Sequence, residues 1–509
     1  MPLISRITPD QLHERRWQLL ALTSVGAFMG PLDGSIVAVA LPDMGRSLHL
    51  SFTASMWVQA VYLLVMAASL IPLGRLADRH GRVRFYLSGI VLFTLGSLFS
   101  ALSMNAAWLM GSRALQGAGA ALLVATSTAI VTAVFPPDER GRALGINVMA
   151  VYLGLSVGPP LGGFLTDHFG WPSIFLINLP IGIAVAGVGY LLLPRRERGD
   201  DHAERLDLPG TALWSLALVC LLVPLTFASE WAWTSPRTLA LLGMAAVSMV
   251  AFVVHEMRVA EPLLSMDLLF RNRLFAAANT AALLNYMALG GIGLLTAVYL
   301  EVVEGRSAEL TGWLMLSQPL LMAALSPLAG RLSDRVGSRL LTSGGMVVIA
   351  VGMLLLASLP GSPDLSRVMA GLALVGVGVA AFSAPNTSAI MGSVGGRELG
   401  LAGAFVGTMR VTGQALSVAV LGGIAASSLG PTGSRLLLTN HAASGPGGGS
   451  LAAKALSVAD LYAHGYRNAM IVGAALVLVG AAASLTRGRR APESARGQAV
   501  RLRGEAGCR

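Results

Sequence analysis

The sequence predicts an all-α membrane protein of fourteen transmembrane helices, built as two six-helix halves with two inserted helices between them. Three observations lead to this fold class. Apolar residues make up 54% of the 509 residues and charged residues only 12%, and the mean hydropathy is +0.68. Fourteen apolar runs are each long enough to cross a bilayer. A basic motif at residues 74–84 recurs at residues 330–339, which indicates a repeated unit.

The apolar runs give the expected spans in order. The first half contains spans at about residues 17–40, 54–73, 84–104, 107–135, 142–166 and 173–193. The two inserted spans lie at about residues 208–228 and 237–255, and we expect them to be lipid-facing or packing helices because they carry few polar residues. The second half contains spans at about residues 274–300, 311–330, 339–359, 367–392, 399–427 and 466–486. We expect the first span to end before Pro42 and to remain in the protein, since no small-residue cleavage site follows it.

These spans divide the chain into five parts. They are a cytoplasmic N-terminus (1–16), the first half (17–194), a cytoplasmic linker with the two extra helices (195–256), the second half (257–486) and a basic cytoplasmic tail (487–509). Within the second half, the glycine-rich stretch 430–465 is expected to be a flexible extracytoplasmic loop. The tail is short of aromatic residues and is expected to be disordered.

The distribution of basic residues predicts the orientation. Placing the N-terminus in the cytoplasm puts 27 of the 36 Lys+Arg on the cytoplasmic side and seven on the other, which are Arg46, Arg237, Arg306, Arg367, Arg435, Lys454 and Arg467. Positively charged loops face the cytoplasm, so both termini are expected there. The net charge of +10 then meets the anionic inner leaflet of the bilayer, and no nucleic-acid partner is needed to explain it.

Composition also excludes several classes of chemistry. Lys454 is the only lysine, and it lies in Ala-Ala-Lys-Ala, so the chain has no lysine for a nucleotide-binding loop or a Schiff base. The bias to arginine, alanine and glycine is typical of a GC-rich bacterial genome. Two cysteines give no disulfide framework, and eight scattered histidines have no metal-ligand spacing. We therefore expect no enzyme activity, no catalytic residue, no metal and no cofactor.

The repeated motif reads as a tight basic loop between two spans in each copy. Gly81 and Gly337 permit a sharp turn. Asp78 and Asp334 are placed to pair with arginines or with the positive end of a neighbouring helix. Two copies in the same setting make an ordinary charged turn an insufficient explanation.

Together with three further motifs, this loop resembles the major facilitator superfamily, and more narrowly its fourteen-span drug:proton antiporters. The motifs are LMGSRALQGAGA at residues 109–120, GLSVGPPLGG at 154–163 and LDGSIVAVALP at 32–42. The resemblance implies a conformational latch at Gly74, Asp78, Arg79, Gly81, Arg82, Gly330, Asp334, Arg335 and Gly337. It also implies that Arg113 takes part in proton coupling. The antiporter motif, which seals the transporter against leak, would comprise Gly154, Gly158, Pro159, Gly162 and Gly163.

The sequence departs from the family pattern at a few positions. Pro172 and Ser173 stand where the family has arginine and an aromatic residue, at the start of the sixth span. Gly34 replaces a threonine, and Ser417 replaces a glycine in the thirteenth span. These changes bear on substrate preference and on the edge of the sixth span rather than on the fold.

Asp33 is the one carboxylate clearly inside an expected span. A charge near the centre of a membrane helix costs about 2.5–3.5 kcal/mol on insertion scales, which indicates a function. We expect Asp33 to take part in proton coupling, because it can hold a proton when enclosed and release the proton when water or a cation reaches it. Asp33 lies about 10 Å below the outer edge of its span and Arg113 about 9 Å below the edge of its own, so the two reach the same depth. We expect Arg113 to favour the ionised form of Asp33 when close. A purely structural pair remains the alternative.

Other polar residues in the spans are candidates for the substrate cavity, although helix packing is an equal or better explanation for each alone. Arg410, in the motif Arg-Val-Thr-Gly, has no acidic residue within the second-half spans, so it must face water, carbonyl groups or a ligand. The remaining candidates are Gln59, Tyr62, Gln116, Asn147, Asn285, Tyr286, Gln318, Asn386 and Gln414.

The sequence thus predicts a secondary transporter in the bacterial inner membrane. It would exchange protons for a hydrophobic or cationic organic compound by alternating access and work as a monomer. A proton-coupled importer or a metabolite exporter of the same fold is the alternative within transport. A non-transporting membrane sensor is disfavoured because the sequence has no sizeable soluble signalling domain.

Overall fold

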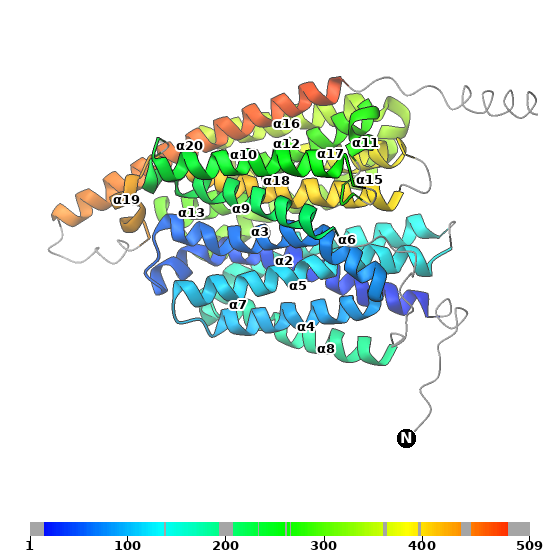
Figure 1. Ribbon diagram of the computed structural model, residues 1–509. Helices are drawn as coiled ribbons and strands as arrows, with labels where there is room; N and C mark the ends of the chain where they lie inside the picture. The colour runs from blue at the N-terminus through cyan, green and yellow to red at the C-terminus, as the bar shows by residue number, and fades with distance from the viewer. Residues whose placement is uncertain are drawn as a thin grey trace, which may run out of the picture.

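The computed structural model describes residues 15–136, 139–192, 207–232, 234–259, 262–264, 266–359, 364–394, 399–438 and 449–486. In this part of the chain, fourteen helical segments are long and apolar enough to cross a membrane, which confirms the predicted fold class. The helices form two bundles, one above the other in Figure 1, with the first half in blue to cyan and the second half in green to red.

The first half consists of α2 (Arg16–Ser47), α3 (Phe52–His80), α4 (Arg82–Ala101), α5 (Ala106–Val134), α6 (Arg140–Phe169), α7 (Ser173–Leu176) and α8 (Asn178–Leu192). The inserted helices are α9 (Leu208–Trp231) and α10 (Pro236–Glu256), followed by the short α11 (Met266–Arg271). The second half comprises α12 (Arg273–Leu289), α13 (Ile292–Val298), the π-helix η1 (Tyr299–Val303), α14 (Ala308–Met315), α15 (Ser317–Val336), α16 (Ser338–Ala357), α17 (Leu365–Met391), α18 (Leu399–Ser427), α19 (Gly430–Leu436) and α20 (Gly449–Leu485).

The helices run between two ends of the bundle, which we call the near end and the far end. At the near end, on the right of Figure 1, α2 begins at Arg16 and α20 ends at Leu485. At the far end, on the left, α2 ends at Ser47 and α19 lies beside the start of α20.

The first span is longer than predicted. The expectation that it ends before Pro42 is wrong, because α2 continues through Pro31 and Pro42 to Ser47. A membrane helix tolerates proline where neighbouring helices satisfy the freed backbone groups. The additional turn carries Asp43 and Arg46 to the far end, where their side chains form an ion pair with 2.6 Å between Arg46 Nη1 and Asp43 Oδ1.

The repeated motif is mainly helix rather than loop, so the predicted basic loop is wrong in both copies. Residues 74–80 form the last turns of α3, and residues 330–336 form the last turns of α15. One residue makes each connection: Gly81, with φ 109°, and Gly337, with φ 91°. These positive φ angles are readily available only to glycine, which explains why that residue stands at both turns.

The internal repeat extends into the packing of the helices. Gly89 and Gly96 on α4 lie against the backbone of α5, at Gly119 and Gln116 respectively. Gly345 and Gly352 follow them by 256 residues, the offset of the repeated motif, and lie against the backbone of α17. Close approach through small residues is a common way to pack membrane helices, and both halves use it at the same place.

The predicted flexible stretch 430–465 is partly helical. Its first residues form α19, and α20 begins at Gly449 rather than near residue 466. Residues 439–448, with most of the glycine-rich run, lie outside the described residues, as do the tail 487–509 and most of the predicted linker, 193–206. The alanine- and leucine-rich sequence after residue 450 has a high helix propensity, which explains the longer helix.

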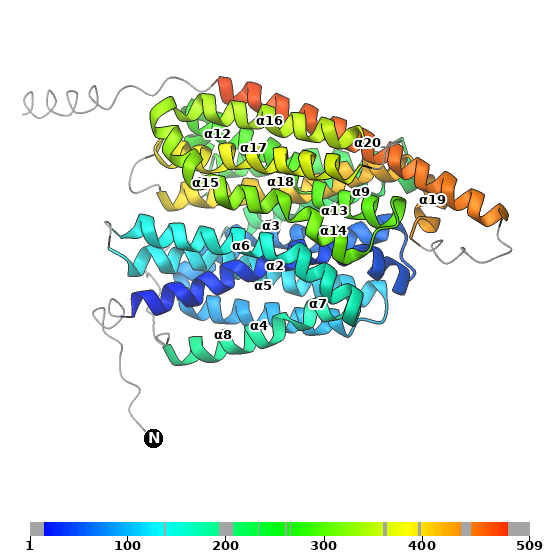
Figure 2. The same cartoon turned by 180° about the vertical axis from the view of Figure 1, so that it is seen from behind.

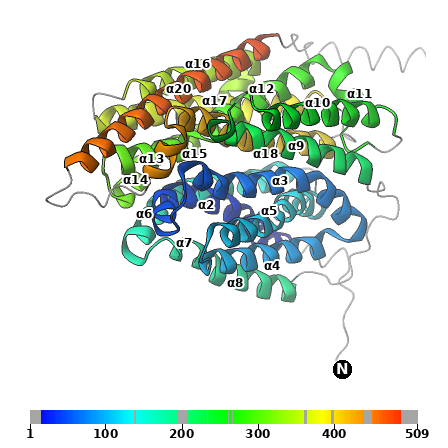
Figure 3. The same ribbon diagram turned by 60° about the vertical axis from the view of Figure 1, so that its left-hand side comes forward.

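The inserted helices α9 and α10 pack on each other, and α9 also packs against both halves. They lie on the face towards the viewer in Figure 1, whereas α6, α14 and α15 lie towards the viewer in the reverse view of Figure 2. Phe227 on α9 stacks on Trp57 of α3, with 5.6 Å between ring centroids. Gly423 on α18 lies against the carbonyl group of Leu225, also on α9. The helix α9 therefore bridges α3 of the first half and α18 of the second, as the rotated view in Figure 3 also shows.

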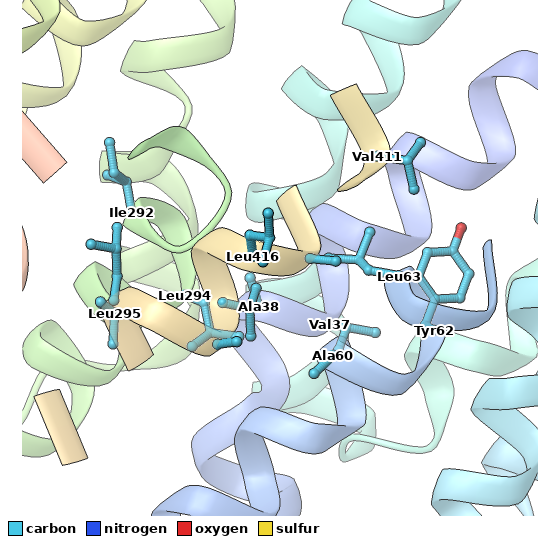
Figure 4. Packing of buried hydrophobic residues seen from close by; sticks show 14 of the residues in the cluster. Val37, Ala38, Ala60, Tyr62, Leu63, Ile292, Leu294, Leu295, Val411 and Leu416 are labelled. Atoms are coloured by element: carbon cyan, nitrogen blue, oxygen red, sulfur yellow. The ribbon is translucent and has the colours of Figure 1, made fainter. Parts of the chain in front are cut away.

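A single large apolar cluster spans the interface between the halves. It includes Val37 and Ala38 on α2, Leu63 on α3, Leu294 on α13 and Leu416 on α18 (Figure 4). Side chains of both halves therefore pack together in the middle of the molecule.

Candidate functional site

A buried network of polar side chains surrounds Asp33 in the first half. The Asp33 side chain is 1% exposed and lies on α2. Its Oδ2 accepts a hydrogen bond from Arg113 Nη1 at 2.6 Å, and its Oδ1 accepts one from Gln116 Nε2 at 2.7 Å. The proximity of Asp33 and Arg113 that their equal depth predicts is therefore present.

Arg113, on α5, is completely enclosed by protein. Its Nε donates to the carbonyl oxygen of Val58 at 3.1 Å, and Nη1 also donates to Gln116 Oε1. The guanidinium carbon lies 4.4 Å from the ring centroid of Tyr62 and 5.7 Å from that of Phe175. Aromatic faces and a carboxylate thus stabilise a buried cation, while Nη2 has no hydrogen-bond partner among the described residues.

Two residues outside the predicted site complete the network. Asn178 Nδ2 donates to Asp33 Oδ1 at 3.3 Å and to Ser97 Oγ at 3.2 Å. Gln116 Nε2 donates to the same Ser97 oxygen at 2.7 Å. The site therefore joins α2, α4, α5 and α8, and any displacement among these helices changes the surroundings of Asp33.

Local features of the sequence bring these helices into register. The sixth span breaks at Ile177 into α7 and α8, which places Asn178 at the start of α8. Before the break, Ser173 Oγ donates to the carbonyl oxygen of Gly170 at 2.7 Å, and Pro172 is the N-cap residue of α7. The departures from the family pattern at Pro172 and Ser173 thus lie at the start of α7 rather than in the Asp33 network. On α5, Gly117 allows the helix to approach the Tyr62 backbone closely.

The remaining cavity candidates are dispersed. Gln116 and Tyr62 belong to the Asp33 network, and Gln59 is buried near Gly34 with its Oε1 unpaired. Asn147 donates to Ser127 Oγ at 3.1 Å, and Asn386 donates to the carbonyl oxygen of Ala278 at 3.3 Å, so both join helices. Asn285 is fully buried, and neither atom of its amide has a partner among the described residues, whereas Gln318 and Gln414 are half-buried.

Arg410, on α18, lies in a different environment from Arg113. It is half-buried and forms no ion pair or hydrogen bond with the described residues. It lies in electrostatic range of Tyr152 on α6, whose hydroxyl group interacts with Ser326 and Ser383 and which also lies near Tyr286. A tyrosine of the first half therefore lies near this arginine of the second half, and the arginine retains donors for a further partner.

The predicted antiporter motif lies on the α6 surface facing α2. A Cβ atom on Gly154 would lie 2.6 Å from the Phe28 carbonyl oxygen, and one on Gly162 would lie 3.0 Å from that of Ile36. A Cβ on Gly158 would overlap Ser35, whose hydroxyl donates to the carbonyl oxygen of Gly154 at 3.3 Å. These glycines let two backbones of the first half come into direct contact.

Gly163 has a different neighbour, which belongs to the second half. A Cβ atom there would overlap the Ala308 backbone at the start of α14, and Gly312 on α14 has the same relation to Pro159. Close by, Asp167 Oδ2 accepts a hydrogen bond from the Glu309 N–H at 2.8 Å. The far ends of the two halves are therefore packed against each other without room for added side-chain atoms.

The predicted latch residues lie at the near end. Arg82 Nε donates to Asp78 Oδ1 at 2.5 Å across the Gly81 turn, and Arg82 Nη1 donates to the Ala129 carbonyl oxygen at 3.4 Å. Arg79, Arg335 and Gly337 are exposed, and the side chain of Asp334 lies outside the described residues. In this structure Asp78 therefore pairs within its own half.

One residue of the repeated motif that the sequence did not indicate as a site residue contacts the segment after the inserted helices. Arg75 Nη2 donates to the carbonyl oxygen of Pro262.

The sequence also did not indicate a second buried acid, Glu301. The ninth span extends to Val303 and takes in Glu301, which is 3% exposed, so the expectation that Asp33 alone lies inside a span is wrong. A single acidic residue within the run YLEVV was the available signal.

In the part of the chain that the structure describes, fourteen helices long and apolar enough to span a membrane form two repeated halves, and the first half contains a buried charged network. These features define a multi-pass transport protein of the membrane. The chain matches the family model described as Major Facilitator Superfamily over residues 23–302 and again over 278–504. It therefore belongs to the Major Facilitator Superfamily. It is a transporter and not an enzyme, and small organic molecules are the class of substrate.

Relatives with curated names extend this result. The riboflavin transporter RibZ of Clostridioides difficile is 32% identical over 417 residues, covering 82% of this chain and 90% of that protein. The multidrug resistance protein Stp of Mycobacterium tuberculosis is 37% identical over 420 residues, covering 82% and 78%. The resemblance to the drug-efflux branch of the superfamily is thereby confirmed.

The fold also matches solved structures. A bacterial homologue of the human lysosomal transporter Spinster, in an inward-facing and unoccupied conformation, aligns with a TM-score of 0.65 at 17% identity. The alignment covers 94% of this chain and 99% of that one. At this identity the likeness shows the fold alone.

Proposed function

We propose that this transporter exports hydrophobic or cationic organic compounds, including drugs or antibiotics, in exchange for protons. It works as a monomer by alternating access in the bacterial inner membrane, with both termini in the cytoplasm. The observation that carries the proposal is the enclosed Asp33–Arg113 pair, a protonatable group in the membrane interior that contacts helices α4, α5 and α8.

The chemistry of proton coupling follows from this geometry. The Arg113 charge and the Gln116 donor stabilise the ionised Asp33 carboxylate while the network is intact. A relative movement of α2 and α5 lengthens the ion pair, and an enclosed carboxylate without its cation is destabilised. Asp33 then takes up a proton, which it releases when the pair forms again. Coupling results because substrate binding and the position of the helices favour one arrangement over the other.

The arginine distribution supports a cytoplasmic location of the near end. The packed far end, with Gly163 against Ala308 and Asp167 bonded to Glu309, then faces outwards, so the structure corresponds to a state closed to the exterior. Among the described residues Asp78 pairs with Arg82 of its own half, and we infer that it contacts the second half when the near end closes.

The sequence similarity to a multidrug resistance protein supports export of toxic compounds. A riboflavin transporter as another relative favours a second candidate, the proton-coupled transport of a metabolite. Both candidates predict the same proton chemistry at Asp33 and differ in the compound transported.

Proteoliposomes carrying a pH gradient test the proposal. We expect a compound to which overexpression confers resistance to dissipate the gradient in vesicles with the protein and not in empty vesicles. Riboflavin and other metabolites would do so instead if the second candidate is correct. Transport of a compound with no movement of protons would refute proton coupling.

A further inference from the structure

Glu301 is a buried carboxyl group that the proposed proton chemistry at Asp33 does not use. It lies in η1, the π-helical turn that ends the ninth span at the far end of the molecule. Its Oε1 atom is enclosed and has no hydrogen-bond partner among the described residues. π-helical turns are uncommon and occur frequently at functional sites.

The charged groups facing Glu301 come from the first half. They are Asp43 and Arg46 on α2 and Asp167 on α6. Arg46 is already paired with Asp43, and Asp167 accepts the Glu309 N–H from α14. On the α20 side the neighbouring ionisable residue is Tyr466, whose ring stacks on Tyr299 of η1.

This arrangement has a direct electrostatic consequence. An ionised Glu301 would be a third carboxylate beside one arginine, enclosed by protein and without a donor at Oε1. Enclosing a charge without a counter-charge or hydrogen bond is strongly unfavourable. A protonated carboxyl group in the same place has no such penalty, so the packing seen at the far end is compatible with the neutral form.

The segment that carries Glu301 is joined to α12 through a break in the ninth span. The ninth span is interrupted between α12 and α13 at Gly290 and Gly291, and the Gly291 N–H donates to Ser417 Oγ at 2.8 Å. Ser417, which departs from the family pattern, therefore caps this break. After the break, α13 packs on α2, so the segment touches both halves.

We propose that Glu301 is a second proton-binding site, which carries a proton while the far end is closed and loses it as that end opens. The proposal rests on the proton coupling proposed above and adds a site on the outer side of the membrane. Ionised Glu301 is repelled by the carboxylates of Asp43 on α2 and Asp167 on α6, so η1 moves away from these two helices. Protonation from the outside allows the halves to close again.

The distance between spin labels across the far end tests this directly. Met104, which is 83% exposed between α4 and α5, and Ser358, exposed after α16, mark the two halves. Both are replaced by labelled cysteine in a full-length protein with Cys220 and Cys508 changed to serine. The distance distribution is then recorded in lipid nanodiscs from about pH 5 to about pH 9, without any transported compound.

We expect the population with a long distance to increase with pH. Glu301→Gln should keep the short-distance population at every pH, because the amide cannot ionise. Glu304→Gln is the matched control: Glu304 lies three residues later, accepts from Tyr299 and pairs with Arg306, so its loss should leave the pH response unchanged. Asp33→Asn should also keep a pH-dependent population of the long distance.

Three results would overturn the proposal. The first is a Glu301→Gln protein that opens with pH as the wild type does, and the second is a wild type that shows no pH response. The third is loss of the pH response in Asp33→Asn, which would assign the response to Asp33. Substrate-driven proton movement in proteoliposomes is measured separately, so each of these results leaves the test of antiport standing.

Discussion

The two halves share a fold but differ in how their interiors are held together. In the first half, charged and amide side chains join four helices around Asp33, and every donor distance to its carboxylate is 3.3 Å or less. In the second half, neutral contacts take this place, such as the Asn386 amide on the Ala278 carbonyl group. Arg410 has no acidic partner among the described residues there. From this difference we expect the Asp33 network to bind the coupled proton, in addition to the proposed site at Glu301, and Arg410 to contact the transported compound.

Removing the acid of the first half should have the largest effect. Asp33→Asn keeps hydrogen-bonding groups for Arg113 but cannot exchange a proton, so substrate-driven proton movement in proteoliposomes should fall to the level of empty vesicles. Asp33→Ala should in addition destabilise the protein by about 3–5 kcal/mol, because it leaves Arg113 enclosed and unpaired. A thermal unfolding scan in detergent separates the two variants. Wild-type rates in the folded Asn variant would place proton coupling elsewhere.

The partner cation should alter the pH dependence of exchange. In Arg113→Ala, Asp33 loses the charge that favours its ionised form, so it should hold its proton longer and the optimum of exchange should move to higher pH. Arg113→Lys should shift the optimum less, since a compact cation remains. Exchange rates measured against pH for the three proteins test this. An unchanged profile, or a shift towards acid, in the Ala variant would make Arg113 a structural residue.

Two glycines of α6 make different contacts: Gly154 faces α2 within the first half, and Gly163 faces α14 of the second half. Gly163→Ala forces α6 away from Ala308, so it should shift the equilibrium towards the open far end by about 1–3 kcal/mol, or about 5- to 150-fold. Gly154→Ala acts on α2 instead and should lower the unfolding temperature without this shift. The spin-label pair at Met104 and Ser358, with thermal unfolding, distinguishes them. Equal behaviour of the two variants would contradict the assignment.

The arginine of the second half should affect substrate and not protons. Arg410→Gln is expected to raise KM about tenfold, from the loss of one charge-assisted contact, with the pH optimum unchanged. The measurement is initial exchange rate against concentration at several pH values. A shift of the pH optimum without a change in KM would show that Arg410 acts on the coupled proton and not on the transported compound.

The near-end turns should have the smallest effect. Asp78 is partly exposed, so the contact with the second half that we infer for the closed near end contributes only about 0–1 kcal/mol. Asp78→Asn should therefore shift the equilibrium only a few-fold, towards the state open at the near end, and Asp334→Asn should shift it less, because Ser338 interrupts the basic run there. Cysteine labelling at both ends reports the populations. A larger effect at Asp334 would reverse the predicted asymmetry.

The spans and the Asp33–Arg113 pair could be predicted from the sequence, because both depend on local information. Apolar length defines a membrane helix, and helical rise gives depth, which brought Asp33 and Arg113 together. Asn178 and Ser97 could not be assigned in this way, since their roles depend on the break at Ile177 and on the rotation of α4. The position of Glu301 inside the ninth span could not be predicted, because a π-helical turn continues the span beyond its apolar run. The motif at Gly74 is helical although it resembles a loop, because α3 continues through charged residues to His80.

Proton release on substrate binding tests the role of Asp33 most directly. Purified protein in a weakly buffered detergent solution with a pH-sensitive dye is mixed with a saturating amount of a transported compound, and the protons released are counted. Wild type should release protons on binding, Asp33→Asn should release none while still binding the compound, and Glu304→Gln should match the wild type. Release of as many protons by the Asp33→Asn protein as by the wild type would contradict the assignment of the coupled proton to Asp33.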